Sequence, residues 1–228
     1  MKVNYFVNDL EAYLEIQKDN NEVFLTVQRE HFEEFISPCG KYKLDLYNYP
    51  TQSGKLNYVE GVITILKDNK ELCSIKRNYS CFYYKWINDY FICGENYQGY
   101  SIIDLDKEEQ SIYFPEEGFK GGGFCWSLVY GVSNNKLVVE GCYWGGSYEV
   151  VVYDFSNPNV LPLPELERFD VDGIAKLKDN VLTIEQELEY RKSDGLFYND
   201  LSDDEQKVLD NNFPKLSAFK IVVITRTI

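Results

Sequence analysis

Short runs of alternating apolar and polar residues fill most of the chain, and turn-forming residues separate them. In CFYYKWINDYFICGENYQGYSIIDLDKEEQSIYF, residues 81–114, the runs are broken at Asn88–Asp89, Gln98–Gly99 and Asp106–Lys107. Alternation with a period of two predicts half-buried strands, and Asn, Asp and Gly at the breaks predict tight turns. We therefore expect successive short antiparallel strands.

Two further segments follow the same pattern. ISPCGKYKLDLYNY opens residues 36–78, which continue to GVITILKDNKELCSIKRN with a break at Asp68–Asn69. Residues 121–158, GGGFCWSLVYGVSNNKLVVEGCYWGGSYEVVVYDFSNP, are broken at Asn134–Asn135 and Gly145–Gly146. Four strands in a repeat of roughly 40–50 residues are typical of a propeller blade, and sheets with two apolar faces must stack on one another.

The flanks of these three segments differ from them. Residues 11–30 alternate around Lys18-Asp19-Asn20-Asn21 and predict a hairpin. LPLPEL at 161–166 predicts an extended crossing, and DNVLTIEQELEY and FKIVVITRTI predict strands. LSDDEQKVLDNNFP is the one segment that predicts a helix, because Ser202 and Glu205 can form a capping box.

We therefore expect one domain over residues 1–228. It would consist of a hairpin cap (1–35), three blade-like repeats (36–166) and C-terminal strands with a short helix (167–228). Whether the terminal strands close a ring or cap exposed sheet edges stays open at this point.

The motifs SPCGKYKL, IIDL and VVYDF carry a resemblance to WD-repeat and related bacterial propeller repeats over residues 36–166. Blades of that kind open on a Ser-Pro-Asp-Gly-Lys-like turn and close on an apolar-Asp-apolar strand end. Here Cys39 replaces the usual acid, and no Gly-His pair or Trp-Asp dipeptide occurs. The chain also resembles bacterial proteins of unknown role. The resemblance implies an all-β fold, a small or incomplete β-propeller of four-stranded antiparallel blades with one short helix near the C-terminus.

Charge narrows the range of partners. The 228 residues carry 23 basic and 37 acidic side chains, a net charge of -14. Such a field repels nucleic acid and anionic lipid and attracts basic proteins, so we expect a basic protein partner, no nucleic acid and no membrane. No apolar run is long enough for a membrane span and no secretory leader opens the chain, which indicates a cytoplasmic protein with six reduced cysteines.

Several kinds of chemistry find little support in the sequence. His31 is the single histidine, so neither a metal cluster nor a histidine triad is expected. The glycines at 121–123 precede the strand-like FCWSLVY rather than a helix, which argues against a phosphate loop. We therefore predict no cofactor and no metal.

Two readings of the glycine-bordered turns remain. Glu95 and Glu140 occupy matched places in neighbouring repeats and would suit glycoside cleavage or carbohydrate binding beside aromatic rings, although turn-bonding roles are commoner for such acids. Alternatively, these turns present a partner-binding face. Its residues would be Tyr97, Gln98, Tyr100, Tyr143 and Trp144.

We favour the binding interpretation. The protein is then a non-enzymatic interaction module, in its specific form an antagonist or immunity-type protein that masks a basic protein. A carbohydrate-directed enzyme or lectin-like domain and a structural subunit of a larger assembly are the alternatives.

Overall fold

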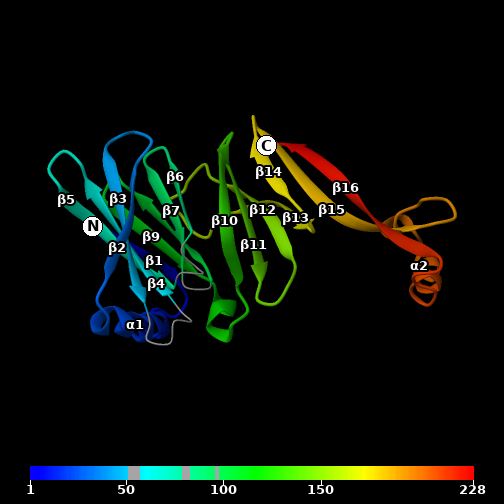
Figure 1. Cartoon of the computed structure of the whole chain (residues 1–228), viewed down its shortest axis with the longest axis horizontal. Helices are drawn as coiled ribbons and strands as arrows, with labels where there is room; N and C mark the ends of the chain where they lie inside the picture. The colour runs from blue at the N-terminus through cyan, green and yellow to red at the C-terminus, as the bar shows by residue number, and fades with distance from the viewer. Residues whose placement is uncertain (51–56, 79–82, 96–97) are drawn as a thin grey trace.

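The computed structural model confirms an all-β chain and describes residues 1–50, 57–78, 83–95 and 98–228. The strands form four sheets that lie in an open row, from the first sheet at one end to the fourth at the other (Figure 1). Each of the first three sheets contains four consecutive strands paired as antiparallel neighbours. The predicted organisation as a single domain stays a prediction.

The first sheet comes from the repeat predicted over residues 36–78, extended at its start. Its alternating residues Tyr42, Leu44 and Leu46 are buried against the second sheet. The predicted Asp68–Asn69 turn is confirmed, because the Lys70 amide donates to Asp68 Oδ1 at 3.0 Å. Its strands are β2 (Glu30–Ile36), β3 (Tyr42–Pro50), β4 (Asn57–Ile65) and β5 (Lys70–Asn78).

The second sheet gains a strand from the N-terminus. The first strand of the chain lies parallel to the last strand of the second repeat, with Tyr5 opposite Ile112. The predicted breaks at Asn88–Asp89 and Asp106–Lys107 are turns. Its strands are β1 (Lys2–Val7), β6 (Tyr84–Ile87), β7 (Tyr90–Gly94), β8 (Tyr100–Asp104) and β9 (Glu109–Phe114).

The third sheet follows a 3-10 turn, η2 (Glu116–Lys120). Asn134 and Asn135 both have positive φ in the turn between its first two strands, as predicted for this break. The sheet's last strand ends at Val171, beyond the predicted limit of the repeats at residue 166. Its strands are β10 (Phe124–Ser133), β11 (Lys136–Tyr143), β12 (Tyr148–Asp154) and β13 (Glu165–Val171).

The fourth sheet has three strands, β14 (Ala175–Lys178), β15 (Val181–Arg191) and β16 (Ser217–Thr227). Because β14 pairs only as far as Ile184, the rest of β15 and β16 forms a two-stranded ribbon. This ribbon projects from the row of sheets and carries η3 (Tyr198–Asp200) and α2 (Asp203–Asp210) at its tip (Figure 1). We call the ribbon and its tip the arm.

The predicted C-terminal helix is confirmed as α2. The Ser202 amide donates to Glu205 Oε2 at 3.1 Å, which is one half of the predicted capping box.

The predicted hairpin over residues 11–30 is wrong, because Leu10–Thr26 forms the helix α1. The Ala12 amide donates to Asp9 Oδ1 at 3.0 Å and caps its start. Tyr13 and Phe24, three turns apart on one helix face, pack against Phe114 and Tyr49. Tertiary packing therefore outweighs the low helix propensity of the Asp-Asn-Asn segment.

Apolar cores lie between successive sheets. One cluster joins the first and second sheets, a second joins the second and third, and a third joins the third and fourth. Since every inner sheet buries both faces, its strands read as nearly continuous apolar runs, as in Leu137–Val139 and Val150–Val152. Within the described ranges, neither α1 nor α2 has the length and apolar character needed to cross a membrane.

Candidate functional site

A hollow with a volume of about 310 Å³ lies between the second and third sheets. Aromatic rings from both sheets line it, together with glycines, two carboxylates and one guanidinium. The rings and charged groups of the lining belong to Tyr100, Tyr113, Glu117, Phe124, Trp126, Tyr143, Tyr153, Glu165 and Arg168. We call this hollow the aromatic cavity.

A stacked pair of rings forms its floor. Tyr100 of β8 lies flat against Trp126 of β10, with ring centroids 4.1 Å apart and planes 13° apart. The Tyr100 hydroxyl accepts a hydrogen bond of 2.7 Å from the Leu163 amide, which holds the β12–β13 connection over the pair. Gly99, directly before Tyr100, lies close to the backbone of β9: its φ is +79°, and a Cβ there would lie 2.1 Å from the Tyr113 carbonyl oxygen.

A fixed positive charge lies on the side of the aromatic cavity that the third sheet forms. Arg168 binds Glu165 through two hydrogen bonds of 2.9 and 2.6 Å and also donates to the Glu149 carboxylate. Its guanidinium carbon lies 4.8 Å from the Phe124 ring centroid and 5.7 Å from that of Tyr143. The hydrogen bonds that Arg168 donates to Glu165 raise the pKa of Arg168, so the cation is permanent.

The lining offers aromatic rings and carboxylates to a ligand. Burial raises the pKa of Tyr100, Tyr113 and Tyr153, so these phenols stay protonated at neutral pH. The lining residues include no His, Lys, Cys or Ser. Ring faces and carboxylates remain as the groups that a ligand would meet.

The structure separates the five predicted partner-binding residues into different roles. Tyr97 lies outside the described residues. Gln98 is buried, and its Oε1 accepts from the Gly123 amide at 3.3 Å, so it fixes the glycine loop. Tyr100 belongs to the core. Tyr143 and Trp144, with 46% and 75% of their surface exposed, are the two that a partner can reach directly.

Glu95 is a buried structural carboxylate. Arg77 of β5 donates to its Oε1 at 2.5 Å, Tyr13 of α1 donates to its Oε2 at 2.9 Å, and the Ser101 hydroxyl also bonds to it. Glu95 therefore joins the first sheet, the second sheet and α1.

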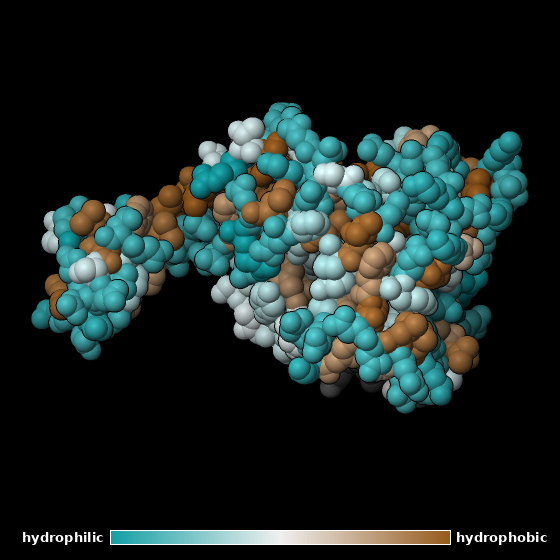
Figure 2. All heavy atoms as spheres, turned by 180° about the vertical axis from the view of Figure 1, so that it is seen from behind, coloured by the Kyte–Doolittle hydropathy of each residue, from teal (hydrophilic) through white to brown (hydrophobic). Residues whose placement is uncertain are grey.

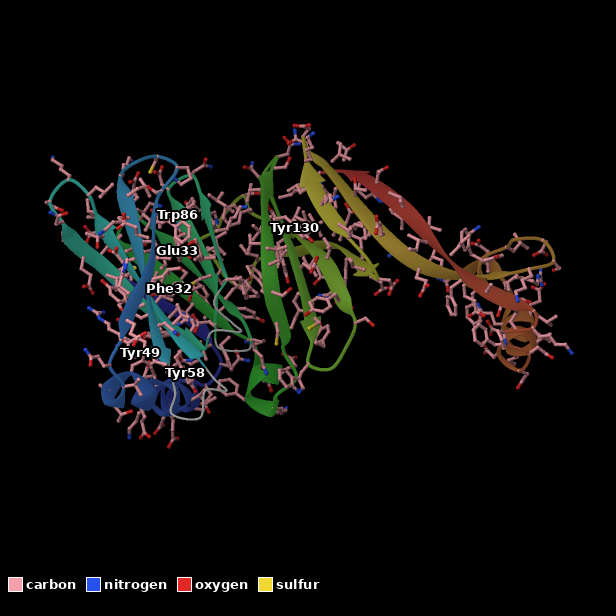
Figure 3. All side chains as sticks on the ribbon, viewed as in Figure 1. Phe32, Glu33, Tyr49, Tyr58, Trp86 and Tyr130 are labelled. Atoms are coloured by element: carbon pink, nitrogen blue, oxygen red, sulfur yellow. The ribbon has the colours of Figure 1, made fainter. Side chains whose placement is uncertain are left out.

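Glu140 occupies a different layer. It accepts a hydrogen bond from the Tyr130 hydroxyl, and Tyr130 packs with the cluster between the third and fourth sheets. Figure 3 places Tyr130 on β10, well apart from Tyr49 and Tyr58 beside α1. Since Glu95 faces the first sheet and α1 and Glu140 faces the fourth sheet, the two carboxylates are not brought together.

His31 has acidic neighbours that the sequence pattern did not indicate. Ligand atoms of His31, Glu34 and Asp45 lie within 4.8 Å of one another. The Lys43 ammonium already lies 3.0 Å from Asp45 Oδ2 and 4.0 Å from Glu34 Oε2. A cation of the chain itself therefore competes for this site.

Cysteines within the described ranges are free thiols. Cys73 and Cys93 are buried in the core between the first and second sheets, Cys39 is exposed, and Cys125 and Cys142 are partly buried. Cys81 lies outside the described residues.

Sequence reasoning missed Tyr113, Phe124 and Arg168 as site residues. Phe124 and Trp126 alternate directly after the glycines at 121–123, which could have placed both on one strand face. No spacing signal points to Arg168, because its partner Glu149 comes from β12 and meets it only through the pairing of β12 with β13.

No protein-family model matches the chain. A stretch of 131 residues is 34% identical to an uncharacterized protein of Acanthamoeba polyphaga mimivirus, covering 55% of this chain and 51% of that protein. The chain thus spans about half the length of the curated relative that it matches.

Proposed function

We propose that this protein is a non-enzymatic interaction module that binds a basic protein partner, with the aromatic cavity, its lining residue Tyr143 and the exposed neighbour Trp144 as the docking place. In its specific form it is an antagonist that masks a basic protein. The observation that supports the proposal is that exposed aromatic rings and an excess of negative charge lie together at one cavity.

The charge around the aromatic cavity is negative. Glu117, Glu149 and Glu165 supply three negative charges and Arg168 one positive charge, which leaves two negative charges. A Lys or Arg side chain of a partner can form ion pairs with these carboxylates and cation–π contacts with the rings of Tyr113 and Tyr143. The net charge of -14 attracts such a partner from a distance.

We also propose that the row of sheets is an incomplete, open propeller related to WD-like repeats. Three successive sheets of four antiparallel strands, stacked face to face, support it. In such an arrangement the turns of neighbouring sheets share a rim, which is where Tyr143 and the aromatic cavity lie.

The positions of Glu95 and Glu140 do not support the glycoside-cleaving alternative. It needs two carboxyl groups roughly 5–10 Å apart around one bond. Glu95 is fully engaged with Arg77, Tyr13 and Ser101, and Glu140 faces another layer.

The test uses the indole N–H signals of the three tryptophans in NMR spectra. On titration with hexalysine at low salt, the signals of Trp126 and Trp144 should shift. Trp86, packed between the first and second sheets, is the internal control and should stay in place. Hexaglutamate should shift none of them.

Two variants sharpen the result. Tyr143→Ala should weaken the hexalysine response, and Phe32→Ala, which removes an exposed ring from β2, should leave it unchanged. Absence of shifts, equal shifts of all three indoles, or an unchanged response in Tyr143→Ala would contradict the proposal.

A further inference from the structure

The outer face of the arm differs from its inner face. Leu182 and Ile184, in the part of β15 that precedes the arm, turn inward and pack on the third sheet, and the same side of the strand continues as the inner face of the arm. The opposite face pairs acidic residues of β15 with apolar residues of β16, since Glu185 lies across from Val223, Glu187 from Ile221 and Glu189 from Phe219. One row of carboxylates therefore runs beside one row of apolar side chains.

The apolar row is open to solvent. Phe219 is 49% exposed, Ile221 66% and Val223 57%. Phe213 extends the row toward the tip, with its ring centroid 5.7 Å from that of Phe219. Figure 2 shows hydrophobic surface along the narrow part of the arm, between the tip and the body. Contiguous exposed apolar surface of this kind is typical of interaction sites.

The charge beside the row has one sign. On this face, Thr183–Glu189 of β15 and Phe219–Thr225 of β16 contribute three Glu and no Lys or Arg, because Lys220 points to the inner side, over Tyr190. A hollow of about 100 Å³ lies directly on the face, and Asp172, Glu185, Glu187 and Ile221 help to line it. Apolar surface and several carboxylates therefore lie side by side at this hollow.

The strand beside this row is also an edge. Among the described residues β16 pairs with β15 alone, at the end of the strand order β14-β15-β16. An edge strand presents alternate unpaired N–H and C=O groups, to which an extended segment can add as a further strand. The register of such an added strand would place every second side chain on the outer face.

We propose that the outer face of the arm docks an extended segment of a partner protein in which apolar residues alternate with Lys or Arg, added as a strand along β16. The Lys or Arg side chains of the segment lie on the outer face, where their aliphatic stems cover Phe219, Ile221 and Val223 and their charged ends reach Glu185, Glu187 and Glu189. A second copy of this chain would bring a second row of carboxylates to this face in place of cations, and like charge disfavours that. This site is separate from the aromatic cavity and goes beyond the proposed function.

The probe is a peptide of alternating Lys and Val, and a peptide of alternating Glu and Val is its control. Calorimetric titration at low salt should show binding of the Lys-Val peptide alone. Hydrogen–deuterium exchange of the complex should show new protection of β16 amides between Phe219 and Thr225.

Two arm variants locate the contact. Glu187→Gln/Glu189→Gln removes two charges without changing side-chain shape and should weaken binding by roughly tenfold or more, the scale of an interface hot spot. Ile221→Lys should weaken it comparably. The matched control, Glu11→Gln/Glu15→Gln on the exposed side of α1, removes the same charge elsewhere and should change affinity by less than about twofold.

The proposal is overturned if the Lys-Val peptide does not bind, if the Glu-Val peptide binds equally well, or if the α1 control weakens binding as much as the arm variants. Concentration-dependent dimerisation that protects β16 without peptide would also overturn it, because a second copy would then cover the face. Hexalysine shifts at Trp126 and Trp144 report on the aromatic cavity alone, so failure of either site is distinguished from failure of the other.

Discussion

Arg77 of β5 donates to Glu95, at the end of β7, across 2.5 Å, and both side chains are buried. Arg77 Nε also donates to the Gly94 carbonyl at 2.7 Å, while Tyr13 reaches the same carboxylate from α1. One buried ion pair thus links two sheets and a helix. A residue that the sequence suggested as catalytic is instead part of the framework.

Replacing Glu95 should therefore destabilise the fold. Glu95→Ala leaves Arg77 buried without its partner, and we expect the free energy of unfolding to fall by about 3–5 kcal/mol. Urea denaturation measures it, with Glu11→Ala as an exposed control expected to change stability by less than about 0.5 kcal/mol. If the Glu95 variant is as stable as the control, the proposed structural role of Glu95 is contradicted.

The hydroxyl and the ring of Tyr100 should contribute separately. Tyr100→Phe removes the hydrogen bond from the Leu163 amide and should cost about 1 kcal/mol of unfolding free energy. Tyr100→Ala also opens a cavity beside Trp126 and should cost about 3–5 kcal/mol. Thermal unfolding of both variants checks this. Equal losses would mean that the stacked ring contributes nothing beyond its hydroxyl.

Glu60 should make the free energy of unfolding depend on pH in the acid range. Burial opposes its ionisation, but hydrogen bonds from Ser74, Tyr49 and Arg29 outweigh burial and lower its pKa. Because the pKa of Glu60 is lower in the folded state than in the unfolded chain, its ionised form stabilises the fold at pH values above the unfolded pKa, near 4. This stabilisation is lost as the pH falls through the pKa of the folded state.

In Glu60→Gln, the unfolding free energy at neutral pH should fall by about 2 kcal/mol and its dependence on pH below about 5 should flatten. Urea denaturation at a series of pH values measures both. The same acid slope in the variant as in the original protein would assign the effect to other carboxylates.

Cysteine reactivity should follow burial. Burial raises the pKa of Cys73 and of Cys93 to about 12, whereas Cys39 is exposed on the turn before β3. Because the thiolate is the reactive species, iodoacetamide at mildly alkaline pH should modify Cys39 first and spare Cys73 and Cys93 until urea unfolds the chain. Mass spectrometry of peptides identifies the sites, and early modification of Cys93 would contradict the packing between the first and second sheets.

Local patterns explain how much of this fold could be predicted. Alternation and the Asn and Gly turns are local signals, and they placed the strands around Asn88–Asp89 and Asn134–Asn135 correctly. The helix α1 could not be read in the same way, since its stability comes from Tyr13 and Phe24 packing on distant strands. The parallel pairing of β1 with β9 is equally non-local.

The candidate site was only partly predictable, for a similar reason. Exposed aromatics in a glycine turn led to Tyr143 and Trp144. Tyr100 has the same local surroundings, yet it is buried because the third sheet packs over it with Trp126. The arm was missed as a surface, because FKIVVITRTI has the alternation of a covered strand and nothing local says that one of its faces stays open.

Affinity capture from native lysate at low salt, with identification by mass spectrometry, tests the central claim most directly. We predict a stoichiometric, basic protein that raised salt elutes and that Tyr143→Ala/Trp144→Ala no longer retains, while Phe32→Ala retains it. Failure to capture a stoichiometric partner, or capture of an acidic protein that these substitutions leave in place, would contradict the account.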